Sequence, residues 1–463
     1  MTLTLRNVEV AGRGGLDVRI EGGRIVEIGP HLRRGASDLD GRGGALIPGL
    51  CDHHIHLFGL AARADSVALE GASSPAEVRA RIAEALKQRP EGAWVRAIGY
   101  HEAMGGALTR EHLDALAPRH RLRVQHQTGA LWMLNSLAIA SVCGEDDPPS
   151  VERDPHGRPT GRIWRGDVWL RSRIGAEPPP LALIGRALAA FGITALTDAS
   201  VTTDADAAER LAQAHRSGEL PQRLTLMSGG ALDAPGDGAF AVGPMKVLLD
   251  DHALPDFEDF VARVVRARRW GRAVAVHCVT AGELALSLAV FGSAGPQPGD
   301  RIEHGGVIPH DAIQPILDLG LTVVTQPAFI HERGDRYAAE VEPGEQVDLY
   351  RCASLLAAGV PVAGSSDAPY ASANPWVGMA SAVERRSRGG RTLGAAERID
   401  PAAALALYLG EPTAPGGRSR RVEAGAAADL CLLNRSLREV LAAPLAEHVA
   451  ATIIDGQVIH DAG

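Results

Sequence analysis

The spacing of hydrophobic and polar residues along the chain follows two different periods. At both ends, short alternating runs (3–10, 16–20, 24–28, 428–433 and 451–459) are separated by turn-forming residues, a pattern typical of β-hairpins. Between the two ends, apolar runs of strand length alternate with Ala-, Leu- and Arg-rich segments of helical period. The pattern indicates repeated βα units on a parallel sheet, with a small composite β domain assembled from both termini.

The central region contains eight apolar runs of strand length. Eight parallel strands, each followed by a helix, close into a (β/α)8 barrel, and the carboxyl ends of the strands form the rim where active sites lie. We therefore predict an α/β fold of the TIM-barrel type. The predicted strands are residues 46–54, 193–198, 224–227, 245–250, 273–277, 300–303, 321–326 and 360–365.

The first connection of this barrel, from residue 57 to residue 193, is far too long for one helix. Its mixture of strand-like and helical stretches predicts an inserted α/β subdomain, ended by the helix-blocking run Pro178-Pro179-Pro180. The predicted domains are residues 1–48 and 413–463 for the β domain, 49–57 and 186–412 for the barrel, and 58–185 for the inserted subdomain.

Composition excludes several classes of protein. With 45% hydrophobic and 22% charged residues, the chain of 463 residues is globular rather than disordered. Its net charge of -9 offers no basic field to nucleic acid, and no apolar window is long enough to span a membrane. Five scattered cysteines and the absence of a secretion signal indicate a cytoplasmic protein without disulfides. We expect a small-molecule ligand, and a homodimer is the common state for soluble enzymes.

One residue stands out in the count of basic side chains. Only two of the 47 basic residues are lysines, Lys87 and Lys246. Lys87 lies in a polar helical stretch, whereas Lys246 lies in the apolar run 245–249. Arginine keeps its proton in proteins, but a buried lysine can become a neutral amine that reacts or binds a metal. Lys246 is therefore a candidate site residue.

Histidines lie at the carboxyl end of the first predicted barrel strand, in the sequence Asp52-His53-His54-Ile55-His56. Side chains two apart on a strand share a face, so His54 and His56 can bind one metal ion together. His53 points to the opposite face and is expected to pack or to support a ligand. A single His-x-His pair is weak evidence, because structural histidines often produce it.

Three further candidates lie at the ends of later strands: His277, His304 and Asp367. Each has a plain structural interpretation, since buried histidines commonly bond to the backbone and an aspartate can cap a turn. That interpretation does not explain why all of them, with Lys246, are predicted on one rim. Nitrogen and oxygen donors in this number suit zinc or a similar divalent ion.

Taken together, these motifs resemble the amidohydrolase superfamily of metal-dependent hydrolases, and within it the branch of the N-substituted formamide deformylases. The match extends in order over nearly the whole chain. Its metal motifs are Pro48-Gly49-Leu50-Cys51-Asp52-His53-His54-Ile55-His56, Lys246, His277, His304 and Gly364-Ser365-Ser366-Asp367-Ala368-Pro369, and its closing β segment includes Asp455-Gly456-Gln457-Val458. The branch is indicated by Gly99-Tyr100, Asn135-Ser136, Gly157-Arg158-Pro159-Thr160-Gly161 and Gln326-Pro327.

The resemblance implies a role for each ligand. His54 and His56 would bind the more buried metal ion, and His277 and His304 the second. Lys246, N6-carboxylated by carbon dioxide, would bridge the two ions, a role that agrees with a lysine able to lose its proton. Whether one or two ions bind, and whether zinc is the native metal, the sequence leaves open.

The substrate pocket departs from the family pattern. Relatives often have a histidine after the glycine that precedes the Asn-Ser motif, and this chain has Ala130 there, so His126 is a candidate replacement. Apolar residues near the predicted rim are further candidates for substrate contact, although a core or lid position is the commoner role for such residues. They include Trp132, Phe329 and Tyr370.

The activity expected from this site is hydrolysis of a non-peptide carbon–nitrogen bond, in an N-acyl or N-formyl amide, by water that the metal activates. Asp367 would act as general base and then as general acid toward the leaving nitrogen. A deaminase or cyclic-amide hydrolase is an alternative on the same site. A non-catalytic binding scaffold is a second alternative, but a drifted scaffold is expected to have lost at least one site residue.

Overall fold

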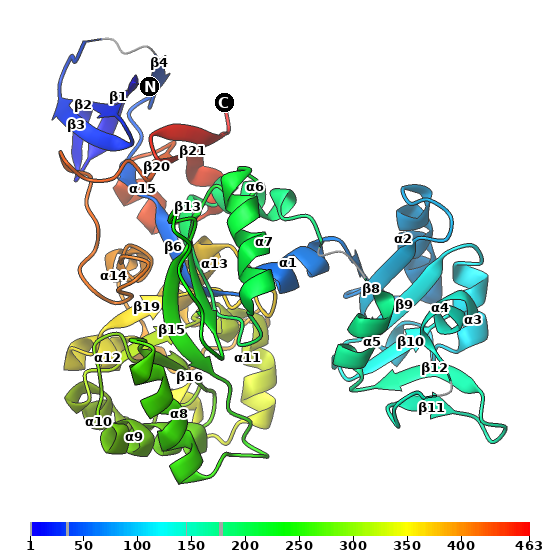
Figure 1. The fold of residues 1–463 in the computed structure, drawn as a ribbon. Coiled ribbons are helices and arrows are strands. Elements are labelled where there is room, and N and C mark those ends of the chain that lie inside the picture. The colour runs from blue at the N-terminus through cyan, green and yellow to red at the C-terminus, as the bar shows by residue number, and fades with distance from the viewer. Residues whose placement is uncertain (1, 34–36, 145, 176–178) are drawn as a thin grey trace. The chain divides into compact units, whose positions relative to one another are not determined.

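The computed structural model in Figure 1 describes residues 2–33, 37–144, 146–175 and 179–463. The chain divides into two compact units, Met1–Leu57 with Leu181–Gly463, and Phe58–Pro180. The second unit is thus an insertion in the first. Of the expected terminating prolines, Pro178 lies outside the described residues. No helix of the described part is long and apolar enough to cross a membrane.

The large unit contains an eight-stranded parallel sheet that closes as a TIM-type barrel. Backbone hydrogen bonds from the turn after the last strand reach the first strand, Asp367 N to His54 O at 2.8 Å and His56 N to Ala368 O at 2.8 Å. The strands, in spatial order, are β6 (Leu50–Ile55), β13 (Ile193–Asp198), β14 (Arg223–Ser228), β15 (Ala241–Val247), β16 (Val274–Cys278), β17 (Arg301–His304), β18 (Thr322–Thr325) and β19 (Val362–Gly364).

All eight predicted runs contain a strand of this barrel, with two differences in extent. The run 46–54 is broken at Gly49, where a Cβ atom would lie 2.1 Å from the Thr194 side chain. Residues before the break pair with the C-terminal region, and residues after it pair with β13. Strand β15 begins at Ala241, earlier than expected, because Ala241 pairs with Thr225 of β14.

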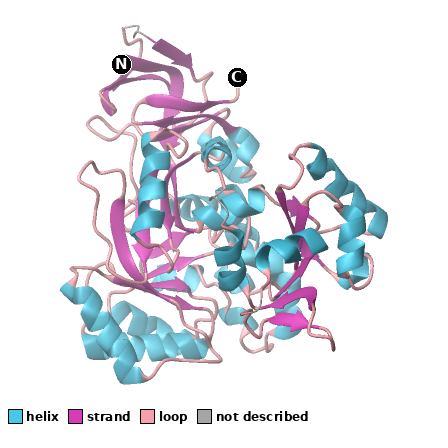
Figure 2. Cartoon of the chain, turned by 45° about the vertical axis from the view of Figure 1, so that its right-hand side comes forward, coloured by secondary structure: helices cyan, strands magenta, loops and turns pink. Residues whose placement is uncertain are grey.

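Helices follow the barrel strands and lie around them (Figure 2). Their ends agree with local sequence: Asp256 caps α8, and three arginines occupy its last turn, where they complement the helix dipole. Thr280 and Glu283 form a capping box at the start of α9. The helices of this unit are α6 (Ala182–Ala190), α7 (Ala205–Arg216), α8 (Phe257–Arg269), α9 (Ala281–Ala294), α10 (Ile313–Asp318), α11 (Ala328–Glu340), α12 (Ala353–Ala358), α13 (Pro375–Glu384), α14 (Pro401–Ala406) and α15 (Leu437–Ala442).

Strand register places the candidate ligands on one rim. Lys246 of β15 pairs with Ala275 of β16, so His277, two residues farther along β16, points to the same face. In turn, His277 pairs with Glu303 of β17, next to His304. Because all strands run in the same direction, these carboxyl ends meet at the same edge.

Two mostly antiparallel sheets, built from the N-terminal and C-terminal regions of the chain, complete the large unit. Strand β5 of the N-terminal region pairs with β20 of the C-terminal region, and one apolar core that includes Leu5, Ile20, Leu430 and Ile453 joins both sheets. Their strand orders are β3-β2-β1-β4 and β22-β21-β20-β5. The bounds are β1 (Thr2–Val10), β2 (Arg13–Glu21), β3 (Arg24–Gly29), β4 (Ser37–Asp40), β5 (Leu46–Pro48), β20 (Leu430–Leu433), β21 (Val449–Ile454) and β22 (Gln457–Asp461).

The inserted unit is built on a six-stranded mixed sheet of order β11-β12-β10-β9-β8-β7. It ends at Pro180, before the expected residue 185, because the next helix, α6, packs against β13 and β21 of the large unit. Its elements are α1 (Leu57–Ala64), β7 (Val67–Ala68), α2 (Pro75–Lys87), β8 (Trp94–Tyr100), α3 (Arg110–Leu116), β9 (Arg121–His126), β10 (Leu131–Leu134), α4 (Ser136–Val142), β11 (Val151–Arg153), β12 (Pro159–Trp164) and α5 (Asp167–Ile174).

Candidate metal centre

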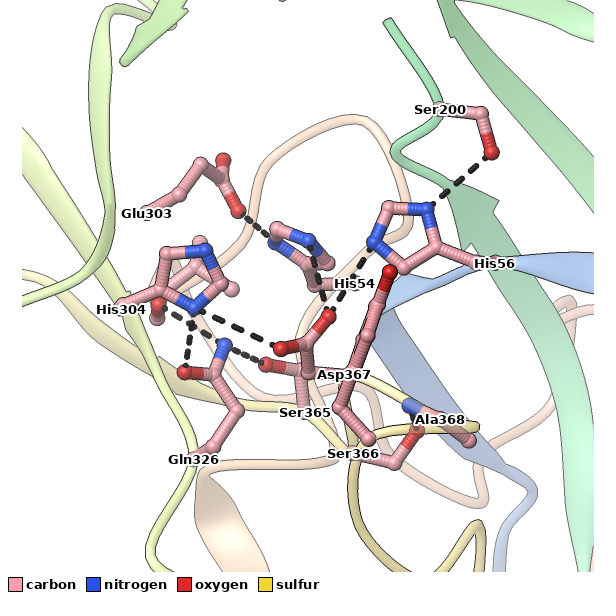
Figure 3. Close-up of polar contacts among 12 residues, drawn as sticks. His54, His56, Ser200, Glu303, His304, Gln326, Ser365, Ser366, Asp367 and Ala368 are labelled. Carbon is pink, nitrogen blue, oxygen red and sulfur yellow. Dashed lines mark hydrogen bonds and ion pairs between the residues drawn. The ribbon is translucent and has the colours of Figure 1, made fainter. Parts of the chain in front are cut away.

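His54, His56 and Asp367 meet at the carboxyl end of strand β6 (Figure 3). The Asp367 Oδ1 atom lies 3.1 Å from His56 Nε2 and 3.5 Å from His54 Nε2. One ligand atom from each of the three residues falls within 4.8 Å of the others. The spacing is that of donors able to share one metal ion.

The two later histidines lie against this group. The rings of His277 and His304 have centroids 4.3 Å apart, and those of His54 and His304 are 4.8 Å apart. Four imidazoles and a carboxylate therefore converge on one rim, as the strand positions predicted. His304 and Asp367 adopt left-handed backbone conformations, with φ of 70° and 54°. Such strained residues are enriched at functional sites.

Gln326 sets the orientation of His304. The Ser365 hydroxyl donates to Thr325 O at 3.1 Å, so it accepts from Gln326 Nε2 at 2.9 Å. The Gln326 Oε1 atom then accepts from His304 Nδ1 at 2.9 Å. With its proton held on Nδ1, His304 keeps the lone pair of Nε2 for a ligand.

Burial favours the neutral form of three histidines of the site. It lowers the pKa of His277 to about 4 and holds the pKa values of His54 and His304 well below the ordinary value. Burial also lowers the pKa of Lys246, against the opposing effects of the Glu303 and Asp367 carboxylates. Metal binding and carboxylation both require a free lone pair on nitrogen, and these shifts favour the unprotonated forms that have one.

Three buried polar atoms of the site have no hydrogen-bond partner among the residues that the structure describes: His54 Nε2, Lys246 Nζ and Asp367 Oδ1. Lys246 is only 2% exposed. Native proteins rarely leave such atoms unpartnered, and an ion is one of the regular explanations. All three are donor types that divalent metals accept, so the residues present fit a metal ion.

Sequence reasoning missed the residue that holds His54. The Glu303 carboxylate contacts His54 Nδ1 through Oε2 and accepts from Arg301 Nε through Oε1, and Arg301 also donates to His53 O at 3.1 Å. A carboxylate behind a metal-binding imidazole fixes its orientation and raises its basicity. The sequence did offer one signal for this role. A glutamate stands two residues after an arginine in a short strand that is buried at every position.

We expect Glu303→Gln to lower metal affinity by about 10- to 100-fold, because the amide is a weaker acceptor than the carboxylate behind His54. Competition with a chromophoric chelator measures this affinity. Glu283→Gln is the matched control, since Glu283 is a buried barrel carboxylate that closes a helix capping box, and glutamine can do the same. Unchanged affinity in Glu303→Gln would show that Glu303 does not support the ligand.

The four candidate substrate contacts have different surroundings. Tyr370 is 60% exposed, and its ring stands edge-on to His56 with centroids 5.7 Å apart. Phe329 is buried beside Tyr350, under the guanidinium of Arg333 at 4.2 Å. His126 and Trp132 belong to the inserted unit.

A second group of possible ligands, His101, Glu102 and His126, lies within the inserted unit. His126 Nε2 donates to Glu102 Oε2 at 3.0 Å, while its Nδ1 accepts from Thr128 N. His101 Nδ1 likewise accepts from Ala103 N at 3.0 Å, which leaves its proton on Nε2. Existing hydrogen bonds therefore use the ring nitrogens that a metal would need.

Comparison with known proteins identifies the family. The model of the amidohydrolase family matches residues 38–460, which is most of the chain. The chain belongs to the amidohydrolase family. It is a hydrolase of carbon–nitrogen bonds, and the resemblance read from the motifs is confirmed.

Several relatives match this amidohydrolase over almost their whole length. The N-substituted formamide deformylase of Arthrobacter pascens is 26% identical, with 98% of this chain and 96% of that protein covered. The putative amidohydrolase YtcJ of Bacillus subtilis (strain 168) is 23% identical, with 90% and 89% covered. The crystal structure of an uncharacterized metal-dependent hydrolase from Pyrococcus furiosus has a TM-score of 0.75 at 20% identity, with 94% and 99% covered. The TM-score shows that this chain and the Pyrococcus furiosus protein have similar folds.

Proposed function

We propose that this amidohydrolase cleaves an N-formyl or N-acyl amide with a divalent metal at the rim of its barrel. The observation that supports the proposal most is the convergence of neutral imidazoles, a buried lysine without a hydrogen-bond partner and the Asp367 carboxylate. Burying polar side chains without hydrogen-bond partners costs free energy, because each side chain loses its contacts with water. A protein that served only as a binding scaffold would gain nothing from this cost.

The residues that would hold the metal are His54, His56, His277, His304 and Asp367, and Lys246 would contribute oxygen donors once it is carboxylated. Nitrogen-rich donor sets with carboxylates suit zinc. A bound divalent ion lowers the pKa of its water toward 7 and polarises the amide carbonyl. Lys246 would gain its carboxylate when its unprotonated Nζ forms a bond to the carbon of carbon dioxide and releases one proton, giving a carbamate.

Asp367 performs the proton transfers. Its Oδ1 atom lies beside the Nε2 atoms of both His54 and His56, and the side chain is buried. The carboxylate accepts a proton from the attacking water and delivers it to the amide nitrogen as the carbon–nitrogen bond breaks. Water thereby adds across the bond: the carbonyl carbon keeps the oxygen, and the nitrogen leaves as an amine.

An N-substituted formamide is the first substrate class to test, because the relative from Arthrobacter pascens has that activity in its name and matches 98% of this chain. Tyr370 would contact the N-substituent, since its exposed ring lies next to His56. Phe329 would instead shape the wall behind this region from its buried position.

We expect N-benzylformamide to release formate and benzylamine in equal amounts, with N-benzylacetamide as the slower acyl analogue. Chelation should abolish turnover and zinc should restore it, because the metal supplies the activated water. The measurement is steady-state product release followed by chromatography. His277→Ala, purified identically, controls for contaminating amidases. Metal-loaded protein that opens a cyclic amide or deaminates an amidine, and leaves both open-chain amides intact, would contradict the substrate class.

A further inference from the structure

Two arginines lie side by side on the sheet of the inserted unit. Arg96 of β8 and Arg123 of β9 are register partners. Their neighbours Val95, Leu122 and Val124 point to the other face, into the main apolar core of this unit. The two guanidinium groups therefore share the opposite face, where like charges on adjacent strands repel each other.

Neither arginine forms an ion pair with a carboxylate of the described residues. Arg123 makes no hydrogen bond to them, and Arg96 makes one long contact, from Nη2 to Gln125 Oε1 at 3.4 Å. Both Nε atoms are buried and without a partner in the described chain. Some arginines of this unit are paired, for example Arg89 with Asp65 at 2.9 Å. The positive charge of Arg96 and Arg123 is thus not neutralised by any ion pair among the described residues.

Tryptophan rings hold the two guanidinium groups. Arg123 lies 5.1 Å from the ring centroid of Trp132 and 5.9 Å from that of Trp94, and Arg96 lies 5.4 Å from Trp132. Trp132 Nε1 donates to Asp167 Oδ1 at 2.8 Å, so this carboxylate is already used to fix the ring. A guanidinium stacked on an aromatic ring keeps its N–H edge free for two-pronged contact with an anion.

The charges around the pair add to the imbalance. Burial, followed by Arg96 and Arg171, lowers the pKa of Arg123 to about 10, and only Asp167 opposes this. Burial is also the main cause of the lowered pKa of Arg96. An anion placed between the two arginines would relieve both the desolvation and the repulsion.

We propose that Arg96 and Arg123 form a binding site for the carboxylate of a small organic anion, with the partly exposed Trp94 in contact with its apolar part. The Trp94 ring favours an organic carboxylate over a strongly hydrated inorganic phosphate, because it offers apolar surface beside the charge, whereas Trp132 is buried and supports the two arginines from below. All four residues of this site belong to the inserted unit, and none of them is among the residues proposed to bind the metal.

Isothermal titration of the full-length protein with benzoate tests the proposal. We expect saturable binding of benzoate, with an affinity at least tenfold lower in Arg96→Gln and in Arg123→Gln. Arg123→Lys should lose less affinity, because lysine keeps the positive charge but lacks the paired N–H donors of the guanidinium group. Arg89→Gln, an arginine already paired with Asp65, is the matched control and should bind like the wild type. The titration is repeated after chelation, because a carboxylate can also bind a metal.

Thermal unfolding separates binding from a purely structural role. Benzoate should raise the melting temperature of the wild type and leave that of the Arg96→Gln/Arg123→Gln double variant unchanged. Three results would overturn the proposal: no binding of benzoate by the wild type, equal binding by the glutamine variants, or loss of binding on chelation. Inorganic phosphate that binds more tightly than benzoate and competes with it would overturn the assignment to an organic carboxylate.

Discussion

Lys246→Ala is expected to lose most of its bound metal and more than about 100-fold in kcat, beyond the 10- to 100-fold typical of residues that only support a ligand. Lys246 is buried, and its Nζ has no hydrogen-bond partner among the described residues of the site. Alanine removes the atom on which the carbamate would form. Plasma mass spectrometry gives the metal content, and turnover of N-benzylformamide gives the rate.

The only other lysine provides a matched control. Lys87 is exposed and paired with Glu84 at 2.7 Å on the surface of α2, so Lys87→Ala should keep wild-type metal content and rate. With two lysines in the chain, a carbamate formed from ¹³C-labelled bicarbonate is easily assigned by NMR, because Lys246→Ala must remove its signal.

Rescue distinguishes a missing carboxylate from a damaged fold. Propionate can enter the cavity left in Lys246→Ala and supply two oxygen ligands, so part of the metal binding and turnover should return. Full metal content and activity in Lys246→Ala would show instead that this lysine does not bridge the ions.

Asp367→Asn is expected to lower kcat by about 10²- to 10⁴-fold, the range associated with loss of a positioned general base. The amide retains the shape of the side chain but cannot take the proton from water or return it to the leaving nitrogen. Substrate binding depends on other groups, so KM should change far less than kcat. Steady-state kinetics across a pH series provides the measurement.

Metal content must be determined for the same Asp367→Asn samples, because this residue is also a proposed ligand. A variant that keeps its metal and still loses turnover supports proton transfer as the main role. Asp400→Asn is the control, since Asp400 only caps helix α14 and asparagine caps equally well. Wild-type kcat in metal-loaded Asp367→Asn would exclude the assigned role.

The pattern of apolar residues was sufficient to predict the barrel. Parallel strands buried on both faces have near-continuous apolar runs, and each of the eight runs contains a strand. The boundaries were less accurate: the run 46–54 supplies two sheets, because its first residues pair with β20 and its later residues pair with β13. These pairings join residues far apart in the sequence, which periodicity does not record.

The candidate ligands were also found from the sequence. Carboxyl ends of parallel strands meet at one rim, so polar residues that follow several strands are brought together whatever the details of packing. Residues that support the ligands were not found. Glu303 is recognised only by its contact with His54, and Gln326 only by its bond to His304. The alternation of side chains along a strand does not predict where the His304 side chain points, because the left-handed backbone of His304 redirects it.

The sequence by itself predicted the barrel, the positions of the candidate ligands and the unusual lysine, because these depend on residue type and on spacing along one strand. Tertiary structure alone decided which groups lack partners. Arg96 and Arg123 are ordinary arginines among 45 until the register of β8 and β9 sets them side by side. The orphaned Lys246 Nζ likewise appears only once neighbouring strands enclose it. Hydrogen-bond satisfaction and burial are properties of contacts between distant segments, and only the folded chain specifies them.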